Sequence, residues 1–435
     1  MEKRLILKHL RLLDGSGSAA LEDAALVVTA GSADAPDGRI EYAGPMSALT
    51  HIPESGDLVL DAPGYTALPG LFNVHVHLDL ELPYLPYYVD KFGDAYRTLV
   101  SYRRAAEALW CGVTTLRNVG GAGDFDIALR DAVNKGMLTA PRIVACGSGI
   151  APHGGHGVTV PGVIQCSGKT EFMKAIRHNI SRTVDQIKLL YTGGLAGASE
   201  GINDKQITNE ELAVCFEVAH GANKKVTAHL SNDAAIKLSV EMGIDCVEHA
   251  YEMKEDTARM MADREVTLVP TLCVSNSREY LKAHGSPDYV LNKLDQAAKT
   301  HRASIEAAIR AKVRICLGTD LLPSDPIDGT NATVREAELL VEAGLTPLEA
   351  IKAATSNSAE LCGLEKATGM LRQGLAGDLV LVKGRPDENI GDLRNLAFVA
   401  KGGRVIRSEL PGYSYEGWQD IAGNGGLSGA SFITW

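Results

Sequence analysis

The sequence predicts an α/β fold: a (β/α)8 TIM barrel accompanied by a small β-sandwich domain built from both chain ends. Two observations lead to this prediction. Short apolar runs alternate with amphipathic stretches through the middle of the chain, and both ends are rich in strand-like segments. Alternating strands and helices indicate parallel pairing, and eight such units favour a closed barrel. An open doubly wound sheet is the alternative, but no GxGxxG motif follows the first run.

The expected sandwich domain comes from strand-like segments at the two ends. Residues 1–65 contain RLILKHLRLL, AALVVTAG and RIEYAGP, and residues 366–420 contain DLVLVKG and AFVAKGGRVIRSEL. Runs of this length, bounded by glycine and proline, are typical of strands. Residues 421–435 are rich in Gly and Ser, and they form either a flexible tail or a tail anchored by Phe432 and Trp435.

The barrel is expected over residues 66–365, where apolar runs precede helical patterns. The eight runs are GLFNVHVHL, VTTLRNVGG, RIVACGSGI, QIKLLYTGG, KVTAHLS, CVEHAYE, TLVPTLCV and RICLGTDLL. A helix is predicted over 208–220, where Thr208 and Glu211 form a capping box and Gly221 follows. Another helix is predicted to begin at Pro347, behind Thr346.

Composition excludes several classes of protein. The 435 residues include 43 Lys and Arg against 54 Asp and Glu, a formal net charge of −11, without a basic block of the kind that binds nucleic acid. No apolar run approaches the roughly 18–20 residues that span a membrane, and the first residues lack a signal-peptide pattern. The eight cysteines form no CxxC pair, so buried thiols are expected. We therefore expect a cytoplasmic protein without a nucleic-acid or membrane partner.

Two histidines end the first run, at the barrel face where active sites of this fold lie. His75 and His77 are two positions apart and therefore share one face of the strand. Two adjacent imidazoles can hold a divalent cation such as zinc. Two hydrogen-bonded histidines near the surface are the alternative.

Three further expected strands end on residues that can bind a metal ion. The strand expected in the fifth run ends on His229, the one in the sixth run on His249 and the one in the eighth run on Asp320. His229 and His249 are separated by the length of one βα unit, so we expect them on adjacent strands at the same level. Four histidines and a carboxylate at one barrel face predict a metal centre.

Lys188 is expected to point inward from the fourth run, among apolar neighbours. Burial of an ammonium group is costly and lowers its pKa, which leaves a neutral, nucleophilic amine. A salt bridge to a carboxylate inside the barrel is the alternative.

These motifs resemble the amidohydrolase superfamily. The segments that match in order and approximate spacing are HVHLD, the lysine of QIKLLYTGG, TAHL, VEHAYE, GTD, GGHG at 154–157 and EAGLTPLEAIKAATSNSAELCGL. The branch that the chain is similar to contains prolidase-type (Xaa-Pro) dipeptidases, related metallo-carboxypeptidases and imidazolonepropionase. Lys188 before the TGG turn resembles the members with two metals, in which this lysine is carbamylated. Imidazolonepropionases resemble the chain less, because they bind one metal without that lysine.

The resemblance implies a centre of two divalent cations, zinc being the first candidate. His75, His77 and Asp320 would bind the more buried cation, His229 and His249 the second, and carbamylated Lys188 would bridge them.

The same resemblance implies a hydrolytic mechanism. A bridging hydroxide would attack the carbonyl, and Asp320 would accept its proton and deliver it to the leaving nitrogen. His153 or His156 in APHGGHG would hydrogen-bond the developing oxyanion; alternatively, this loop only turns the chain.

Substrate contacts are expected in the loops after the strands. Tyr84 in the first loop either walls an apolar pocket or packs on a neighbouring subunit, and a homo-oligomer is expected. Tyr191 and Arg117 are candidates to hold a substrate carboxylate, with an ion pair inside the fold as the alternative for Arg117. The branch commonly has a His-Gly pair after the fifth-strand ligand, where this chain has LSN, and LLPSDPIDGTN after Asp320 lacks the usual small residue and histidine. An unusual substrate would follow from these departures.

The leading functional hypothesis is a binuclear metal-dependent amidohydrolase that cleaves an amide bond of a dipeptide or an N-acyl amino acid, or of a bulky natural-product amide. A hydrolase of cyclic amides, lactones or phosphoesters on the same metal centre is the first alternative. A catalytically inactive scaffold is the second, and it would be expected to lack metal ligands.

Overall fold

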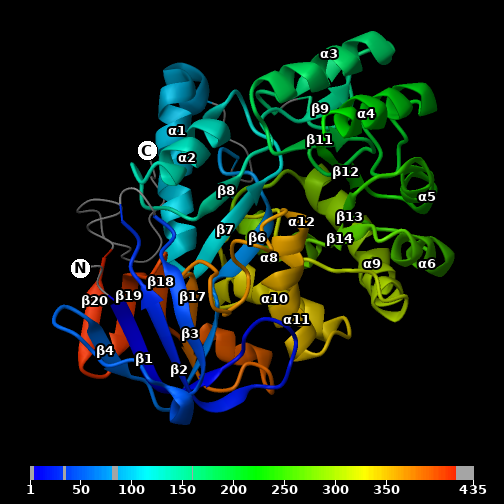
Figure 1. Cartoon of the computed structure of the whole chain (residues 1–435). Helices are drawn as coiled ribbons and strands as arrows, with labels where there is room; N and C mark the ends of the chain where they lie inside the picture. The colour runs from blue at the N-terminus through cyan, green and yellow to red at the C-terminus, as the bar shows by residue number, and fades with distance from the viewer. Residues whose placement is uncertain (1–3, 33–35, 81–86, 159, 418–435) are drawn as a thin grey trace.

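The structure is a computed structural model that describes residues 4–32, 36–80, 87–158 and 160–417. A strand-rich part and a helix-rich part lie side by side (Figure 1). The Gly/Ser-rich segment 421–435, with Phe432 and Trp435, lies outside the described residues.

Strands from both chain ends form one nine-stranded sheet. Its order is β20-β19-β18-β17-β5-β1-β2-β3, with β4 paired to β1. β5 lies parallel to β1 and antiparallel to β17, so it joins the first strands of the chain to the last ones. The strands are β1 (Arg4–Leu12), β2 (Leu21–Thr29), β3 (Arg39–Pro45), β4 (Leu58–Asp61), β5 (Tyr65–Pro69), β17 (Leu379–Lys383), β18 (Leu396–Lys401), β19 (Arg404–Leu410) and β20 (Tyr413–Glu416).

This sheet curls around its own core. Gly31 N donates to Gly402 O at 2.7 Å, which joins the loop after β2 to the turn between β18 and β19. Leu26 from one half of the sheet and Phe398 from the other belong to one apolar cluster. The two chain ends therefore meet as predicted, in a single continuous sheet rather than two separate ones.

Parallel strands form the framework of the helix-rich part. One sheet has the order β6-β7-β8 and the other β10-β9-β11-β12-β13-β14. Their bounds are β6 (Leu71–Val76), β7 (Val113–Asn118), β8 (Arg142–Val144), β9 (Ile150–Pro152), β10 (Ile164–Cys166), β11 (Gln186–Leu190), β12 (Lys225–Leu230), β13 (Cys246–His249) and β14 (Thr267–Val269). Seven of the eight predicted runs contain a strand of these sheets.

The eighth run has a single bridge residue instead of a regular strand. Ile315 forms a parallel bridge with Leu268 of β14. On the other side of the run, Val74 N of β6 donates to Leu317 O at 2.8 Å. Asp185 N, just before β11, donates to Ala145 O, just after β8, at 2.8 Å. Main-chain hydrogen bonds thus connect the two parallel sheets at both of their junctions.

Helices follow most of these strands. They are α1 (Tyr87–Trp110), α2 (Phe125–Asn134), α3 (Gly168–Ser181), α4 (Asn209–Gly221), α5 (Asp233–Met242), α6 (Glu255–Asp263), α7 (Leu272–Asn276), α8 (Arg278–Ala283), α9 (Asp288–Arg310), α10 (Ala332–Glu342), α11 (Pro347–Ala353) and α12 (Ser356–Leu361). Short 3-10 helices η1 (Met46–Ala48) and η2 (Ile390–Arg394) and the hairpin β15 (Pro326–Ile327) with β16 (Thr330–Asn331) complete the set. The capping box predicted at Thr208 and Glu211 is confirmed, and Thr346 and Glu349 form a second one in front of Pro347.

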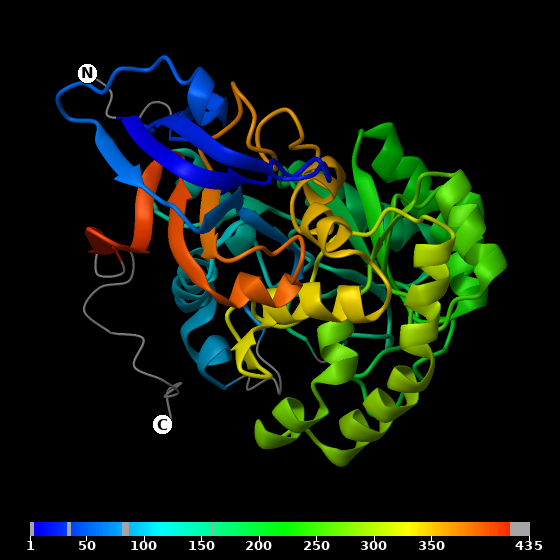
Figure 2. The ribbon, with the colours of Figure 1, turned by 90° about the horizontal axis from the view of Figure 1, so that it is seen from below.

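The curled sheet packs against one side of the helix-rich part (Figure 2). On β17, Leu379 and Leu381 enter the core of the sheet, whereas Val380 and Val382 enter the apolar core of the helix-rich part. This alternation gives the sheet two buried faces. The two parts therefore share an apolar interface and are not independent bodies.

The cysteine side chains agree with the expectation of buried thiols. All eight cysteines are free, and six of them are buried. Among the described residues, no helix is long and apolar enough to cross a membrane.

Candidate metal centre

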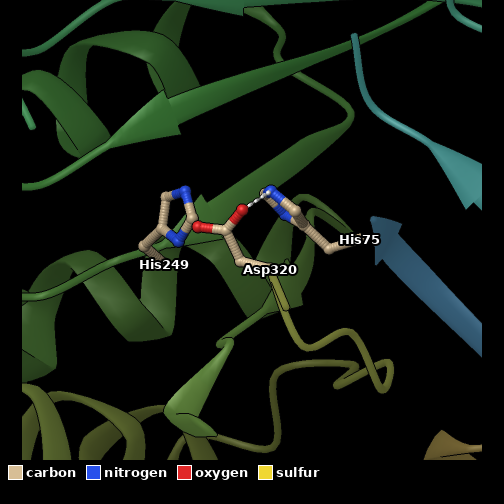
Figure 3. Close-up of side chains that lie close together, drawn as sticks. All are labelled: His75, His249 and Asp320. Carbon is tan, nitrogen blue, oxygen red and sulfur yellow. Dashed lines mark ion pairs between the residues drawn. The ribbon is translucent and has the colours of Figure 1, made fainter. Parts of the chain in front are cut away.

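Side chains from separate strand ends converge in the interior. His75 belongs to β6, His249 to β13, and Asp320 follows the bridge residue of the eighth run. Each of these three offers a ligand atom within 4.8 Å of the others (Figure 3). His75 Nε2 and His77 Nε2 each lie 3.4 Å from Asp320 Oδ1. His75, His77 and Asp320, which were predicted for the more buried cation, therefore lie together, and His249, predicted for the second cation, lies beside His75 and Asp320.

A glycine permits this close approach. A Cβ atom on Gly318 would lie 2.6 Å from His75 Cβ, so a side chain at this position would collide with β6. Asp320 N donates to His75 O at 2.9 Å, and Asp320 adopts a left-handed backbone with φ of 53°. The glycine of the GTD motif is thus required for the contact between the two ligand-bearing segments.

His229 on β12 and Lys188 on β11 complete the predicted ligand set. The rings of His229 and His249 lie 4.4 Å apart between centroids. Both histidines and Lys188 line the same cavity as His75, His77 and Asp320. Burial lowers the pKa of Lys188, against the opposing effect of Glu248 and Asp320. A lowered pKa favours the neutral amine, the form that reacts with carbon dioxide.

Hydrogen bonds on one side of each ring leave the other nitrogen available to a cation. His75 Nδ1 lies 2.6 Å from Glu248 Oε2, His77 Nδ1 donates to Gly120 O at 2.8 Å, and His229 Nε2 donates to Gly193 O at 3.0 Å. A neutral imidazole carries one proton, so His77 presents Nε2 and His229 presents Nδ1 as acceptors.

Two features make these residues suitable for a divalent cation. His75 Nε2 is buried, and among the described residues it has no hydrogen-bond partner. A cation would supply the partner that this nitrogen lacks. Imidazole and carboxylate donors suit zinc and related metals.

Burial sets the charge of the candidate ligands. It lowers the pKa of His77 to about 4 and the pKa of His229 and of His249 well below the ordinary value. Burial alone would raise the pKa of Asp320, but His75 and His77 beside it bring the pKa below its usual value. Neutral imidazoles and an ionised carboxylate are the forms that bind metal.

The buried carboxylate of Glu248 contacts His75 at Nδ1, the ring nitrogen opposite the one that faces Asp320. Its Oε1 accepts from Arg117 Nη2 at 2.5 Å and from Thr227 Oγ1, while Oε2 faces His75. Arg117 is fully buried, donates to Val74 O at 2.5 Å and does not line the cavity. The structure therefore favours the ion-pair alternative for Arg117 over contact with a substrate carboxylate.

Glu248 and His249 are neighbours in sequence, yet both point into the interior. Strict alternation along a strand would place them on opposite faces. His249 and the following Ala250 adopt left-handed backbones, with φ of 70° and 56°. Because of this departure from strand geometry, His249 faces the other candidate ligands while the adjacent Glu248 contacts His75.

The two histidines of APHGGHG occupy different environments. His156 lines the cavity, its ring stacks on His229 at 4.3 Å, and its Nδ1 lies 2.8 Å from Glu200 Oε1. A Cβ on Gly194 would lie 2.2 Å from His156 Cε1, so this glycine of the TGG turn makes room for the ring. His153 is exposed and does not line the cavity.

Among the described residues, the tyrosines that line the cavity are not the ones predicted from the sequence. Tyr84 lies outside the described residues, and Tyr191 is fully buried without lining the cavity. Tyr251, which the sequence analysis did not single out, lines the cavity and stacks on His249 at 5.3 Å. Tyr251 could have been predicted to lie near the site, because it follows the predicted ligand His249 by two residues. Glu200 lies in a loop, and no sequence pattern predicts its contact with His156.

The candidate ligands open onto a cavity of about 480 Å³. Most of the remaining wall is apolar and includes Leu80, Val119, Val160, Pro161, Val163, Leu190, Leu195, Val274, Leu281, Pro287 and Val290. Asp79, Ser286 and Tyr289 contribute polar atoms. A concave, mainly apolar wall with a few polar groups is typical of a small-molecule site.

A cluster of imidazoles, a carboxylate and a buried lysine that converge from parallel strands defines a class of hydrolases. The model of the amidohydrolase family matches residues 66–408, and the chain belongs to this family, in its prolidase-like branch. The resemblance found in the sequence is thereby confirmed, and the protein is a hydrolase that acts on amide C–N bonds.

Three known proteins illustrate the similarity. An ochratoxinase of Aspergillus niger is 29% identical over 372 residues, which cover 78% of this chain and 75% of the relative. The crystal structure of the A. niger ochratoxinase has a TM-score of 0.80 at 26% identity and covers 97% of this chain and 99% of its own.

A Xaa-Pro dipeptidase with bound methionine also has a TM-score of 0.80 at 26% identity, covering 93% of this chain and 99% of its own. A 5-methylthioadenosine/S-adenosylhomocysteine deaminase of Moorella thermoacetica is 26% identical over 400 residues, which cover 85% of this chain and 86% of the relative.

Replacing Glu248 with Gln is expected to affect both stability and metal binding. The variant leaves the Arg117 guanidinium buried without its counter-charge, a loss of about 3–5 kcal/mol in unfolding free energy. It also removes the charged partner of His75, which is expected to weaken metal binding by about 10- to 100-fold. Denaturant unfolding and metal titration against a chelator measure the two effects.

The matched control is Glu360→Gln, which removes an exposed ion pair with Arg314. Exposed pairs contribute at most about 1 kcal/mol, so both properties should stay close to wild type. A Glu248→Gln variant that behaves like this control would contradict the assigned support of His75.

Proposed function

We propose that the protein is a binuclear metal-dependent amidohydrolase. The observation that carries this proposal is that all six side chains of the predicted ligand set line one cavity. His75, His77 and Asp320 would hold one cation, His229 and His249 the other, and carbamylated Lys188 would bridge the two. Bound divalent cations would polarise a substrate carbonyl and lower the pKa of water.

We also propose that the parallel strands form a (β/α)8 barrel over residues 66–365, beside a β domain made of residues 1–65 and 366–420. Hydrogen bonds at both junctions between the parallel sheets support closure. The four candidate histidines stand near or just after the C-terminal ends of their strands, which is the face where sites in this fold are found, and Lys188 is the central residue of β11.

Asp320 is the proposed general acid and base. Its side chain is 22% exposed and lines the cavity, so it can exchange protons with groups there. A lowered pKa makes it a carboxylate that can accept a proton from the attacking water. Delivery of that proton to the amide nitrogen completes hydrolysis, because an amine anion is a poor leaving group.

His156 is the proposed partner of the substrate carbonyl oxygen. Its contact with Glu200 and its stacking on His229 fix the ring at the cavity wall. Because Nδ1 faces the Glu200 carboxylate, the protonated imidazolium form would present Nε2–H as a donor and stabilise the charge that develops on the oxygen. His153 is exposed and away from the cavity wall, so we do not assign it this role.

The proposed substrate is an amide with a bulky apolar group, such as an N-acyl amino acid with a large acyl chain. The apolar wall and the cavity volume of about 480 Å³ support a substrate larger than a small dipeptide. Similarity to an ochratoxinase and to a Xaa-Pro dipeptidase supports cleavage of an amide bond within such a molecule.

Metal content is expected to be two equivalents per chain. Elemental analysis of protein purified with bicarbonate tests this expectation, and a single equivalent would instead favour a mononuclear cyclic amidase or deaminase.

Lys188→Ala should lose the bridged cation and recover part of its activity when short carboxylates are added, because these replace the carbamate. Full metal content in Lys188→Ala would contradict the bridging role.

Asp320→Asn is expected to reduce kcat by at least about 100-fold, because the amide cannot accept and deliver the proton. The amide oxygen remains a weak ligand, so metal content measured in parallel should largely persist. Turnover close to wild type in the metal-loaded variant would contradict the role of Asp320.

Val160→Thr is expected to lower kcat/KM by roughly 10-fold for amides with a large apolar acyl group. The substitution keeps the size of the side chain and places a hydroxyl in the cavity wall. Val158→Thr is the matched control, since Val158 is 37% exposed and does not line the cavity. Equal kcat/KM in both variants across acyl groups from acetyl to naphthoyl would argue against an apolar acyl site.

A further inference from the structure

Helix α9 holds the backbone of the strand end that carries His249. His301 of α9 donates through Nε2 to His249 O at 3.0 Å, and its Nδ1 lies 2.8 Å from Ser275 Oγ. One turn further along the helix, Ser304 Oγ donates to Ala250 O at 2.5 Å. His301 is fully buried and Ser304 is nearly so.

These two carbonyls belong to the two left-handed residues described above. A non-glycine residue with φ of 70° or 56° lies in a sparsely populated region of backbone conformation, and it persists only where surrounding contacts determine it. Without such contacts the strand would relax toward ordinary alternation, which turns the imidazole of His249 away from Asp320. His301 therefore contacts His249 at its carbonyl, and the hydrogen bond from Ala250 N to Leu230 O at 3.0 Å holds the other side of this segment.

Contacts between aromatic rings also connect His301 to His249. His301 meets the ring of Tyr251 edge-on at 4.9 Å, and Tyr251 stacks on His249 at 5.3 Å. The far side of the His249 imidazole is fixed separately, because its Nδ1 lies 2.7 Å from Thr271 Oγ1. His301 thus contacts both the backbone of His249 and the ring that packs on its side chain.

We propose that His301 is a positioning residue that holds His249 in the left-handed conformation needed to bind the second cation. This proposal rests on the proposed function, in which His229 and His249 hold that cation. His301 does not line the cavity, so it is not placed to contact a substrate there. Its effect should therefore appear in cation affinity and not as the loss of a reacting group.

The experiment compares wild type, His301→Ala and His301→Gln in full-length, metal-depleted protein titrated with Co²⁺ and with Zn²⁺ against a chelator. His301→Ala is expected to bind the second cation about 10- to 100-fold more weakly while the first is retained, as for other residues that orient a metal ligand. His301→Gln keeps an N–H donor and should recover part of the affinity. Visible absorption of the Co²⁺ protein reports the geometry of the second site independently of turnover.

Leu294→Ala is the matched control, because Leu294 is a buried residue of the same helix outside the cavity wall. It should lower the melting temperature as His301→Ala does and leave both cation affinities unchanged. Second-site affinity that is equal in His301→Ala and wild type, or equally reduced in Leu294→Ala, would overturn the positioning role. A wild-type chain that binds one cation only would overturn the binuclear function itself, which is a distinguishable result.

Discussion

The buried carboxylate of Glu248 is the charge on which the arrangement of the site depends. Burial opposes its ionisation, yet Arg117 and His75 hold the pKa of Glu248 well below its ordinary value. A buried charge is tolerated only when such partners are in place. Because Arg117 comes from β7, His75 from β6 and Glu248 from β13, one carboxylate fixes three strands relative to one another. The orientation of the His75 ring follows from this requirement.

The candidate ligands could be predicted from the sequence because parallel strands present their C-terminal ends on one face. His75 and His77 follow from the period of two along a strand, and Asp320 follows from the GTD ending of another run. His249 was predicted by the same rule but reaches the interior through left-handed residues that the rule does not contain. The alternation that places His249 inward would place Glu248 outside. The contacts of Glu248 with His75 and Arg117 were therefore not predicted.

Other parts of the site could not be predicted from periodicity, because they depend on the conformation of loops and on contacts between residues far apart in the sequence. His153 and His156 share one glycine-rich motif, and the structure distinguishes them because His156 contacts Glu200 and lines the cavity whereas His153 is exposed. Arg117 had two chemically reasonable partners, a substrate carboxylate or a carboxylate of the fold, and the choice depends on Glu248 more than 130 positions away. The eighth run lacks a regular strand although its composition is that of one.

The sheet built from both ends has a consequence for the synthesis of the chain. β5 needs β17 as its neighbour, and paired residues such as Tyr65 and Lys383 are more than 300 positions apart. The edge of β5 therefore stays open until residues 379–383 have been translated. An open edge pairs readily with other chains, so the nascent protein is exposed to aggregation during this interval.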